Sequence, residues 1–430
     1  MNPVALLFLS FIGLVIIRVP VAYALALSSL LVVYLEDLRP TLVVQQMFQG
    51  LNSFTLLAVP FFLLSGQLLN SGLITDRLVR LAQVMVGHIR GGLAHINVLV
   101  SMIFAGMSGS STADTAGVGS VMIPAMIGRG FDRRFTIALT AASSTMGSII
   151  PPSIMMIVYG AMGGVSIGGL FLAGAIPGAF VGLAQMGYSY YYAVRHGYPA
   201  EPRASLGEFW SAWKAGFLPL LVPVIIIGGV LSGEFTATES GMVATVYVLI
   251  LTFVVYRSSR LARLPGVLAE AAVLYSQPLL AVAAATVFGW LLAYFQAPQA
   301  IGDLAGGMTE SATLTVMAIA LIFIVVGVFM DAIPAIIIFM PIVTHLVETS
   351  GAHPIHVGLV VVMTLAMGLI TPPYGLCLLL SCAIGRERVS RVMPQMLVFY
   401  GLFLAVILLI ILVPGIALFL PRLVMPQFAG

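Results

Sequence analysis

The stretch Ser108-Gly109-Ser110-Ser111-Thr112-Ala113-Asp114-Thr115 interrupts a sequence that is otherwise almost entirely apolar. Apolar residues 98–107 precede it and residues 118–127 follow it. Each flank is shorter than the about 20 helical residues that cross a bilayer. A polar, glycine-containing break at membrane depth is tolerated only where it is buried in protein or lines a wet cavity. The stretch therefore predicts the tip of a re-entrant helical hairpin, and it is the first candidate site for an ion or a solute.

The composition of the 430-residue chain is that of a polytopic membrane protein, because 60% of its residues are hydrophobic and 8% are charged. The net charge of +3 gives no indication of a nucleic-acid partner. The single lysine, Lys214, follows no glycine-rich phosphate loop, which excludes ATP hydrolysis by a Walker A site. The core offers no His-rich metal cluster and no assignable nucleophile–base pair, so we do not expect an enzyme.

The apolar residues divide the chain into ten segments and two hairpins. The segments are residues 4–17, 21–35, 54–70, 134–160, 168–194, 216–232, 237–256, 266–296, 356–384 and 394–420, and the hairpins are residues 92–127 and 313–346. Amphipathic stretches at about 74–90 and 298–310 are expected along the membrane surface. We predict an all-α fold with a first repeat at 1–195, a cytoplasmic connection at 196–215 and a second repeat at 216–430.

The positions of arginine and lysine predict how the spans are oriented. If the N-terminus is outside and each segment crosses once, every Arg and Lys except Arg39 and Arg422 falls on the inner side. The mouth of the first hairpin then faces the cytoplasm and that of the second faces outward. Both chain ends are predicted to be periplasmic.

The two halves share a motif order and are predicted to have opposite orientations. Each half contains three spans, a hairpin and two further spans, and an odd number of crossings turns the second half upside down. An aspartate precedes a proline by ten residues in both hairpins, at 114–124 and 331–341. A Gly-x-x-x-Pro-Pro motif then follows at 147–152 and at 368–373, within the segments 134–160 and 356–384. These features predict inverted-topology repeats, each with one helix broken at Pro-Pro.

The broken helices and hairpin tips have oxygen atoms suited to a hard cation. Proline frees the carbonyl four residues earlier, so the two breaks expose carbonyls at 147–148 and 368–369. The hydroxyl groups that suit Na⁺ are those of Ser108, Ser110, Ser111, Thr112 and Thr371. Helix N-termini after each break can hold an anionic substrate group without any arginine. Asp114 and Asp331 are each interpreted as a Na⁺ ligand, a proton carrier or a helix cap, and these alternatives stay open.

Four motifs together resemble the large membrane subunit (DctM-like) of the tripartite ATP-independent periplasmic (TRAP) transporters. They are residues 108–116, Gly-Ser-Ile-Ile-Pro-Pro-Ser at 147–153, Met-Asp-Ala-Ile-Pro-Ala at 330–335 and Gly-Leu-Ile-Thr-Pro-Pro-Tyr-Gly at 368–375. The resemblance covers essentially the whole chain. It implies an elevator-type ion-transporter fold and Na⁺-coupled secondary import of an organic acid, such as a C4-dicarboxylate or sialic acid, across the bacterial inner membrane.

The resemblance also implies two partner proteins. A periplasmic substrate-binding protein delivers the substrate, and a small four-helix membrane subunit, expected here as a separate chain, supports the scaffold. At least two Na⁺ ions are expected as coupling ions, and no organic cofactor.

Site residues follow from the resemblance position by position. The first Na⁺ site is expected at Ser108, Thr112, Gly147, Ile150 and Pro151. The second Na⁺ site is expected at Gly327, Thr371 and Tyr374. The substrate site is expected between the tips, at Ser110, Ser111, Asp114, Asp331 and Pro334. The alternative hypothesis is a stand-alone ion-coupled dicarboxylate or citrate carrier, or an antiporter, of the same superfamily.

Overall fold

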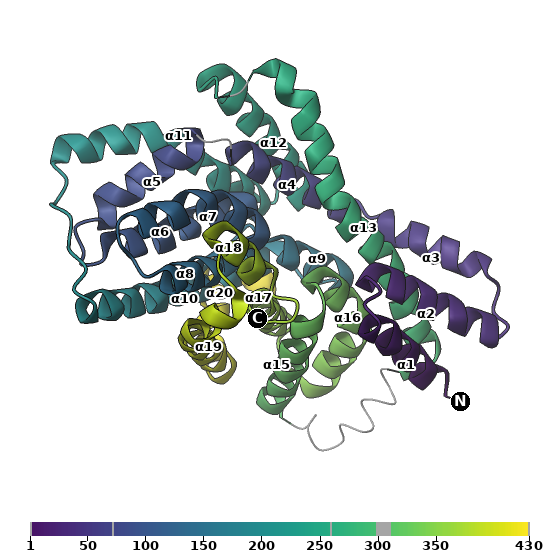
Figure 1. The fold of residues 1–430 in the computed structure, drawn as a ribbon. Coiled ribbons are helices and arrows are strands. Elements are labelled where there is room, and N and C mark those ends of the chain that lie inside the picture. Colours follow the sequence, from purple (N-terminus) through teal and green to yellow (C-terminus); the bar gives the residue numbers. More distant parts are fainter. Residues whose placement is uncertain (1, 71–72, 259, 298–310, 429–430) are drawn as a thin grey trace.

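The computed structural model describes residues 2–70, 73–258, 260–297 and 311–428, and every regular element within these ranges is helical (Figure 1). The predicted amphipathic stretch at 298–310 lies outside the described residues. The first half comprises α1 (Pro3–Ile16), α2 (Val21–Leu35), α3 (Thr41–Leu51), η1 (Thr55–Leu57), α4 (Ala58–Leu69), α5 (Leu73–Val86), α6 (Gly92–Ser108), α7 (Ser111–Gly128), α8 (Arg133–Ser144), η2 (Thr145–Ser148), α9 (Ile154–Gly163) and α10 (Ile167–Arg195).

The second half repeats this order of long helices, hairpin and broken helix. It comprises α11 (Leu206–Ser232), α12 (Ala237–Ile250), η3 (Leu251–Val255), η4 (Leu261–Arg263), α13 (Leu264–Tyr294), α15 (Ala312–Phe329), α16 (Ala332–Ser350), α17 (Pro354–Gly368), α18 (Leu376–Gly385), α19 (Val389–Leu412), α20 (Pro414–Val424) and η6 (Pro426–Phe428). The helices α6 and α7 form the first hairpin, and α15 and α16 form the second.

Local sequence explains where the hairpin and break helices begin and end. Gly109 adopts a left-handed conformation (φ +63°) and ends α6, because glycine has no Cβ to oppose that backbone. Ser110 then caps α7 by accepting a hydrogen bond from the Ala113 N–H. Ser153 caps α9 in the same way, and Asp331 caps α16. The polar residues that mark the tips in the sequence are therefore also the residues that start the returning helices.

The broken helices have the form predicted from their Pro-Pro pairs. In the first half α8 ends at Ser144, η2 continues to Ser148, and α9 begins at Ile154. In the second half α17 ends at Gly368, and α18 begins at Leu376. Both Pro-Pro peptide bonds, Pro151–Pro152 and Pro372–Pro373, are cis.

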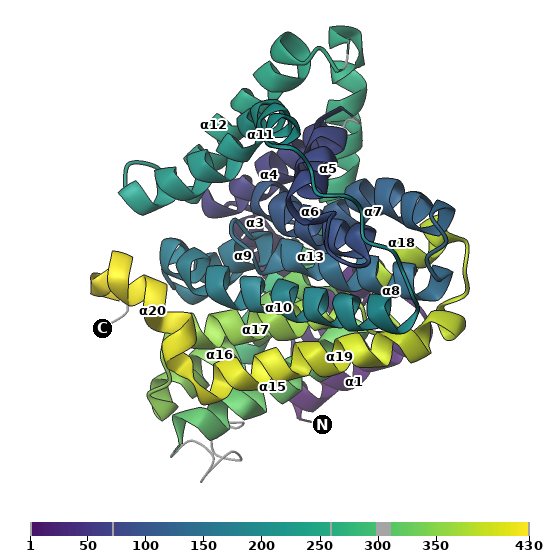
Figure 2. The same ribbon diagram turned by 90° about the vertical axis from the view of Figure 1, so that its left-hand side faces the viewer.

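The two halves pack crosswise. Helix α9, which follows the first break, packs against α16 and α17 of the second half. Helix α18, which follows the second break, packs against α7 and α8 of the first half. The long helices α10 and α19 run beside this centre (Figure 2). Each half therefore completes the packing of the other half's hairpin.

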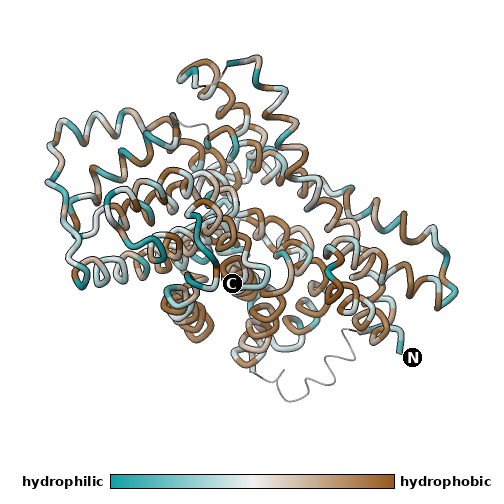
Figure 3. The backbone as a smooth tube through the Cα atoms, viewed as in Figure 1, coloured by the Kyte–Doolittle hydropathy of each residue, from teal (hydrophilic) through white to brown (hydrophobic). Residues whose placement is uncertain are grey.

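The remaining helices lie around this centre. At one end of the molecule α1 and α2 pack on α13, and at the opposite end α5 packs on α11 (Figure 1). Seven described helices are long and apolar enough to cross a membrane, or eight if the bent pair α3 with η1–α4 forms one span. Apolar residues cover much of the outside of these helices (Figure 3), including Val246, Leu321 and Leu404. The predicted all-α polytopic fold with hairpins and broken helices is thus confirmed.

Two segments differ from the sequence-based boundaries. Residues 41–51 form α3, which meets the next helix at a 60° bend, although the apolar segment was predicted to begin at 54. Three glutamines in α3 lower its hydropathy and hide it from a search for apolar runs. The predicted last segment, 394–420, is two helices separated at Val413, because Pro414 begins α20.

Candidate functional site

The first hairpin tip is a buried network of side-chain oxygens. Ser108, at the end of α6, is fully buried, and its hydroxyl donates a hydrogen bond to Oδ1 of Asp114 in the first turn of α7. The Ser110 backbone N–H donates to Ser108 Oγ at 3.3 Å. The hydroxyls of Ser110 and Thr112 lie 3.1 Å apart. Ser108 and Asp114 thus close the tip across its turn, while Thr112 lies beside Ser110 and is partly exposed.

Ser111 joins the first tip to the first break. Its hydroxyl lies 2.7 Å from Ser148 Oγ and donates to the Thr145 carbonyl at 3.2 Å. The Gly109 carbonyl accepts a hydrogen bond from the Ile154 N–H at 3.1 Å. Main-chain and side-chain contacts therefore hold the tip against the broken helix at two points.

Gly147 allows Asp114 to approach the break closely. A Cβ at Gly147 would lie 2.5 Å from Asp114 Oδ2 and 2.9 Å from the Ser111 backbone nitrogen. Asp114 is fully buried, and its Oδ2 has no hydrogen-bond partner among the described residues. An unpartnered buried carboxylate oxygen is costly, so this position calls for a cation, a proton or water.

The carbonyls at the breaks already have partners at three of the four predicted positions. The Ser148 carbonyl accepts a hydrogen bond from Ser153 Oγ at 2.6 Å. In the second break the Gly368 carbonyl accepts from the Thr371 N–H at 3.0 Å, and the Leu369 carbonyl accepts from the Cys377 N–H at 2.9 Å. Since a carbonyl oxygen has two lone pairs, each retains capacity for one further contact.

Helix α4 supplies a polar contact that the sequence analysis did not select. Asn70, which ends α4, donates from Nδ2 to the Ala113 carbonyl at 3.3 Å. Its Oδ1 occupies the place where a Cβ of Gly117 would stand, 1.7 Å from that position. Further along α4, a Cβ at Gly66 would lie 3.1 Å from the Ser108 Cβ. Helix α4 thus meets the first hairpin through one amide and one close glycine contact.

The second hairpin tip is held mainly by main-chain contacts. A Cβ at Gly368 would lie 2.4 Å from the Gly327 carbonyl oxygen, so the two backbones touch. The Tyr374 N–H donates to the Val328 carbonyl at 3.1 Å. Asp331 caps α16 by accepting from the Ala332 N–H at 2.6 Å, and its carboxylate interacts with the Tyr374 side chain. Gly327, Asp331 and Tyr374 are therefore brought together.

The other residues predicted for the second site lie nearby in the fold. The Thr371 hydroxyl donates to the Met367 carbonyl at 2.8 Å, which leaves its oxygen lone pairs as acceptors. Pro334 is buried in the first turn of α16. The Tyr400 hydroxyl of α19 donates to the Ile370 carbonyl at 2.6 Å and supports the break from outside. In the first break Ile150 is half-buried and Pro151 is buried.

Cys377 connects the two tips. It lies in the first turn of α18, is fully buried, and its thiol contacts Thr115 of α7. Asp114 and Asp331 both lie close enough to Cys377 for their charges to act on its thiol group. The candidate ion and substrate residues of the two halves therefore belong to one central region.

The comparisons with known proteins identify the family. Residues 8–416 match the family described as Tripartite ATP-independent periplasmic transporter, DctM component. The chain belongs to this family. The resemblance drawn from the four sequence motifs is thus confirmed, and the chain is a multi-span membrane permease of a bacterial transporter family rather than an enzyme.

Two relatives show how far this DctM-family permease resembles characterised members. The sialic acid TRAP transporter large permease protein SiaM of Vibrio cholerae is 36% identical over 413 residues, which cover 96% of this chain and 97% of that protein. The C4-dicarboxylate TRAP transporter large permease protein DctM of Pseudomonas aeruginosa is 37% identical over 377 residues, which cover 88% of each chain.

A solved structure supports the fold of this DctM-family permease. The structure of MtrF from Neisseria gonorrhoeae, which belongs to a class of antimetabolite efflux pumps, has a TM-score of 0.60. The match covers 86% of this chain and 83% of that chain at 14% sequence identity. At this identity the likeness concerns the fold alone.

The structure adds two polar residues to the site, Thr145 and Asn70, and also the hydroxyl of Ser148, of which the sequence indicated only the carbonyl. Thr145 and Ser148 contact Ser111, and Asn70 contacts the first turn of α7. A signal for the first two exists in the sequence, since Ser143-Ser-Thr-Met-Gly-Ser148 is a polar run inside a predicted span. Asn70 and Gln67 are polar residues at the end of an otherwise apolar segment, but only the fold shows that Asn70 contacts Ala113.

Proposed function

We propose that this chain imports an organic acid by Na⁺ symport across the bacterial inner membrane, with both chain ends in the periplasm. The substrate is a carboxylate of the C4-dicarboxylate or sialic acid class. A periplasmic substrate-binding protein delivers it, and a separate small four-helix membrane subunit supports the scaffold. The names of SiaM and DctM support this substrate class, since each permease covers nearly the same length of chain.

The observation that carries Na⁺ coupling is the unpartnered Oδ2 of the buried Asp114. Oδ2 faces Gly147, where a close approach of the first break leaves room for no side chain. Ser108 satisfies only the other carboxylate oxygen. A small hard cation at this position would neutralise the charge and complete the coordination with hydroxyl and carbonyl oxygens.

The substrate is proposed to lie on the open side of the first tip. Ser111 is engaged with Thr145 and Ser148, so its role is to hold the tip to the break. Ser110 and Thr112 contact each other, and Thr112 is partly exposed. The Ser110 hydroxyl, together with the N–H groups of the first turn of α7, is suited to a carboxylate, and the Thr112 hydroxyl beside it belongs to the first Na⁺ site. Asp331 and Pro334 would border the same space from α16.

We propose an elevator movement of the hairpins and broken helices against the remaining helices. Contacts within the moving body are dense hydrogen-bond networks, such as that around Ser111. Contacts across its boundary involve small residues, since a Cβ at Gly66 would lie 3.1 Å from Ser108 and one at Gly289 would lie 3.3 Å from the Ile337 carbonyl. Sliding along such a boundary would break few hydrogen bonds, among them the bond from Asn70 Nδ2 to the Ala113 carbonyl.

Uptake into proteoliposomes tests Na⁺ coupling. The Ser108→Ala, Thr112→Ala and Thr371→Ala variants should each raise the Na⁺ concentration needed for half-maximal uptake. Ser101→Ala is a matched control, because Ser101 is equally buried in α6 and contacts Ser143 away from the tip. If Na⁺ dependence is unchanged in all three variants, the site assignment is wrong.

The same assay distinguishes the alternative of a stand-alone carrier. Under the proposal, uptake requires the substrate-binding protein and the small membrane subunit. Transport of free substrate by this chain without a binding protein would instead support the dicarboxylate or citrate carrier or the antiporter hypothesis.

A further inference from the structure

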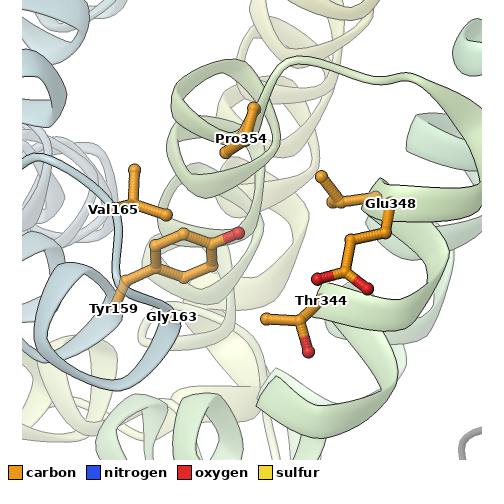
Figure 4. A pocket seen from close by; sticks show the side chains of 7 residues that line it. Tyr159, Gly163, Val165, Thr344, Glu348 and Pro354 are labelled. Atoms are coloured by element: carbon orange, nitrogen blue, oxygen red, sulfur yellow. The ribbon is translucent and has the colours of Figure 1, made fainter. Parts of the chain in front are cut away.

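A small cavity lies away from both hairpin tips, between a helix of each half. It measures about 90 Å³ and is lined by α9, α16 and the start of α17 (Figure 4). Its lining residues include Tyr159, Gly163, Thr344, Glu348 and Pro354. Glu348 lies sixteen residues beyond Ala332, which corresponds to about 24 Å along α16. The cavity is therefore separate from the Asp114 and Asp331 region.

The cavity contains the hydroxyl of Tyr159, a residue that is otherwise almost fully buried. Tyr159 is 2% exposed, and its ring reaches from α9 with the hydroxyl directed into the cavity (Figure 4). No hydrogen bond of this hydroxyl exists within the part of the chain that the structure describes. Solvent reaches this hydroxyl through the cavity, so it is available to bind water or a ligand. The opposite wall carries the carboxylate of Glu348, an exposed residue on α16 (Figure 4).

The electrostatic surroundings of the cavity favour a cation. Gly163, which ends α9, lines the cavity, and Glu348 lies in the last turn of α16, and helix C-termini carry partial negative charge. Neither ion pair found among the described residues involves Glu348. Three sources of negative potential therefore meet here.

Apart from the Tyr159 hydroxyl, the side chains of the lining offer an anion no donor. The Thr344 hydroxyl donates its proton to its own helix, at 3.0 Å from the Met340 carbonyl and 3.1 Å from the Pro341 carbonyl. The single helix N-terminus at the rim, that of α17, begins with Pro354, which has no N–H. A volume of about 90 Å³ has room for a few water molecules. The space thus suits a small, partly hydrated ion.

We propose that this cavity binds a monovalent cation, held by the Glu348 carboxylate, the Tyr159 hydroxyl and water. The bound cation joins α9 of the first half to α16 of the second hairpin. This site is additional to the two coupling-ion sites and does not depend on them.

Cation-dependent stability of the purified full-length protein tests this site. The thermal unfolding midpoint is titrated with NaCl or KCl, with choline chloride keeping the ionic strength constant. Each variant is made in the wild-type chain and in a Ser108→Ala/Thr112→Ala/Thr371→Ala background, which removes the proposed tip sites. Glu348→Gln should raise the cation concentration for half-maximal stabilisation at least about tenfold in both backgrounds, and Tyr159→Phe about threefold.

Glu234→Gln is the matched control, because Glu234 is an exposed carboxylate in the turn between α11 and α12 and does not line the cavity. It should leave the titration unchanged. An unchanged titration of Glu348→Gln in both backgrounds overturns the cavity site. Loss of cation dependence only through the tip variants also overturns it, while leaving Na⁺ coupling at the tips intact.

A second measurement covers the case in which Glu348→Gln does not fold. Crystals of the wild-type protein grown with RbCl should show an anomalous scattering peak between Tyr159 and Glu348. Absence of that peak at saturating Rb⁺, with Rb⁺ present at other sites, contradicts the proposal.

Discussion

The two hairpin tips have an aspartate at the same relative position, yet different kinds of contact hold them. At the first tip the side chains of Ser108, Ser111 and Asp114 form the contacts, and Asp114 retains an unpartnered oxygen. At the second tip the backbones of Gly327 and Gly368 touch, and one carboxylate oxygen of Asp331 accepts the hydrogen bond that caps α16. The two motifs thus give both halves the same backbone arrangement, while the side-chain oxygen atoms that could bind an ion are concentrated in the first half. Substitutions that remove a side-chain oxygen should therefore impair the first tip more. Substitutions that add a methyl group to a glycine should impair the second tip more.

The largest effect is expected from Gly368→Ala. Its Cβ would lie 2.4 Å from the Gly327 carbonyl oxygen and 2.7 Å from the Gly327 carbonyl carbon, and neither backbone atom can move aside alone. We expect a loss of about 3 kcal/mol of stability and no measurable uptake. Gly401→Ala, where a Cβ meets no atom within 4 Å, is the control. Equal thermal unfolding midpoints for both variants would contradict the claim that contact between the backbones of Gly327 and Gly368 holds the second tip.

Gly117→Ala tests the boundary of the first tip with α4. The new Cβ would displace the Asn70 side chain and break its hydrogen bond to the Ala113 carbonyl. We expect a loss of about 1–2 kcal/mol, measured as a lower unfolding midpoint. The double variant Asn70→Ala/Gly117→Ala should recover part of this loss, since the clash is then removed. Gly128→Ala, at the other end of α7 and in open space, should have little effect.

Neutralising the two aspartates compares the tips directly. Asp114→Asn keeps the shape of the side chain but removes the charge that faces Gly147, so the Na⁺ concentration for half-maximal uptake should rise about tenfold or more. Asp331→Asn keeps a good capping residue at the start of α16, so we expect a change of about threefold or less. Uptake at varied Na⁺ measures both. The opposite order would mean that the second tip holds the more important charge.

The smallest difference is expected between Ser111→Ala and Tyr374→Phe. Ser111→Ala removes contacts to both Thr145 and Ser148, at about 1 kcal/mol each before relaxation. Tyr374→Phe removes only the interaction with Asp331 and leaves the backbone contact to Val328. Ser111→Ala should therefore lower the unfolding midpoint further. A larger effect of Tyr374→Phe would show that side chains also dominate the second tip.

Much of the fold could be predicted from the sequence because few residue types are permitted at membrane depth. The polar stretch 108–115 and the two Pro-Pro motifs stand out against an apolar background, and they coincide with a hairpin tip and with both helix breaks. Helix α3 escaped detection because its glutamines resemble a loop in a hydropathy profile. Pro414 begins a new helix, and the apolar residues on either side of it conceal that boundary.

The sequence allowed us to predict which motifs lie together in the site, but not which of their atoms form hydrogen bonds. The sequence places Ser108 and Asp114 at one tip, yet their mutual hydrogen bond follows from the tightness of the turn at Gly109. Asn70 is distant in the sequence, and only the packing of α4 against α7 shows that Gly117 leaves room for it. Such pairings depend on tertiary packing, for which periodicity and composition contain no signal.

The crosswise packing of α9 and α18 has a consequence for biogenesis. Helix α9 is synthesised long before α16 and α17, so the face of α9 that packs against them has no protein partner until the second half is made. The first half is therefore unable to mature as an independent unit during synthesis, in contrast to ordinary chains whose N-terminal domain folds first. The centre of the molecule is complete only once α18 has been inserted, because α18 packs against α7 and α8 of the first half.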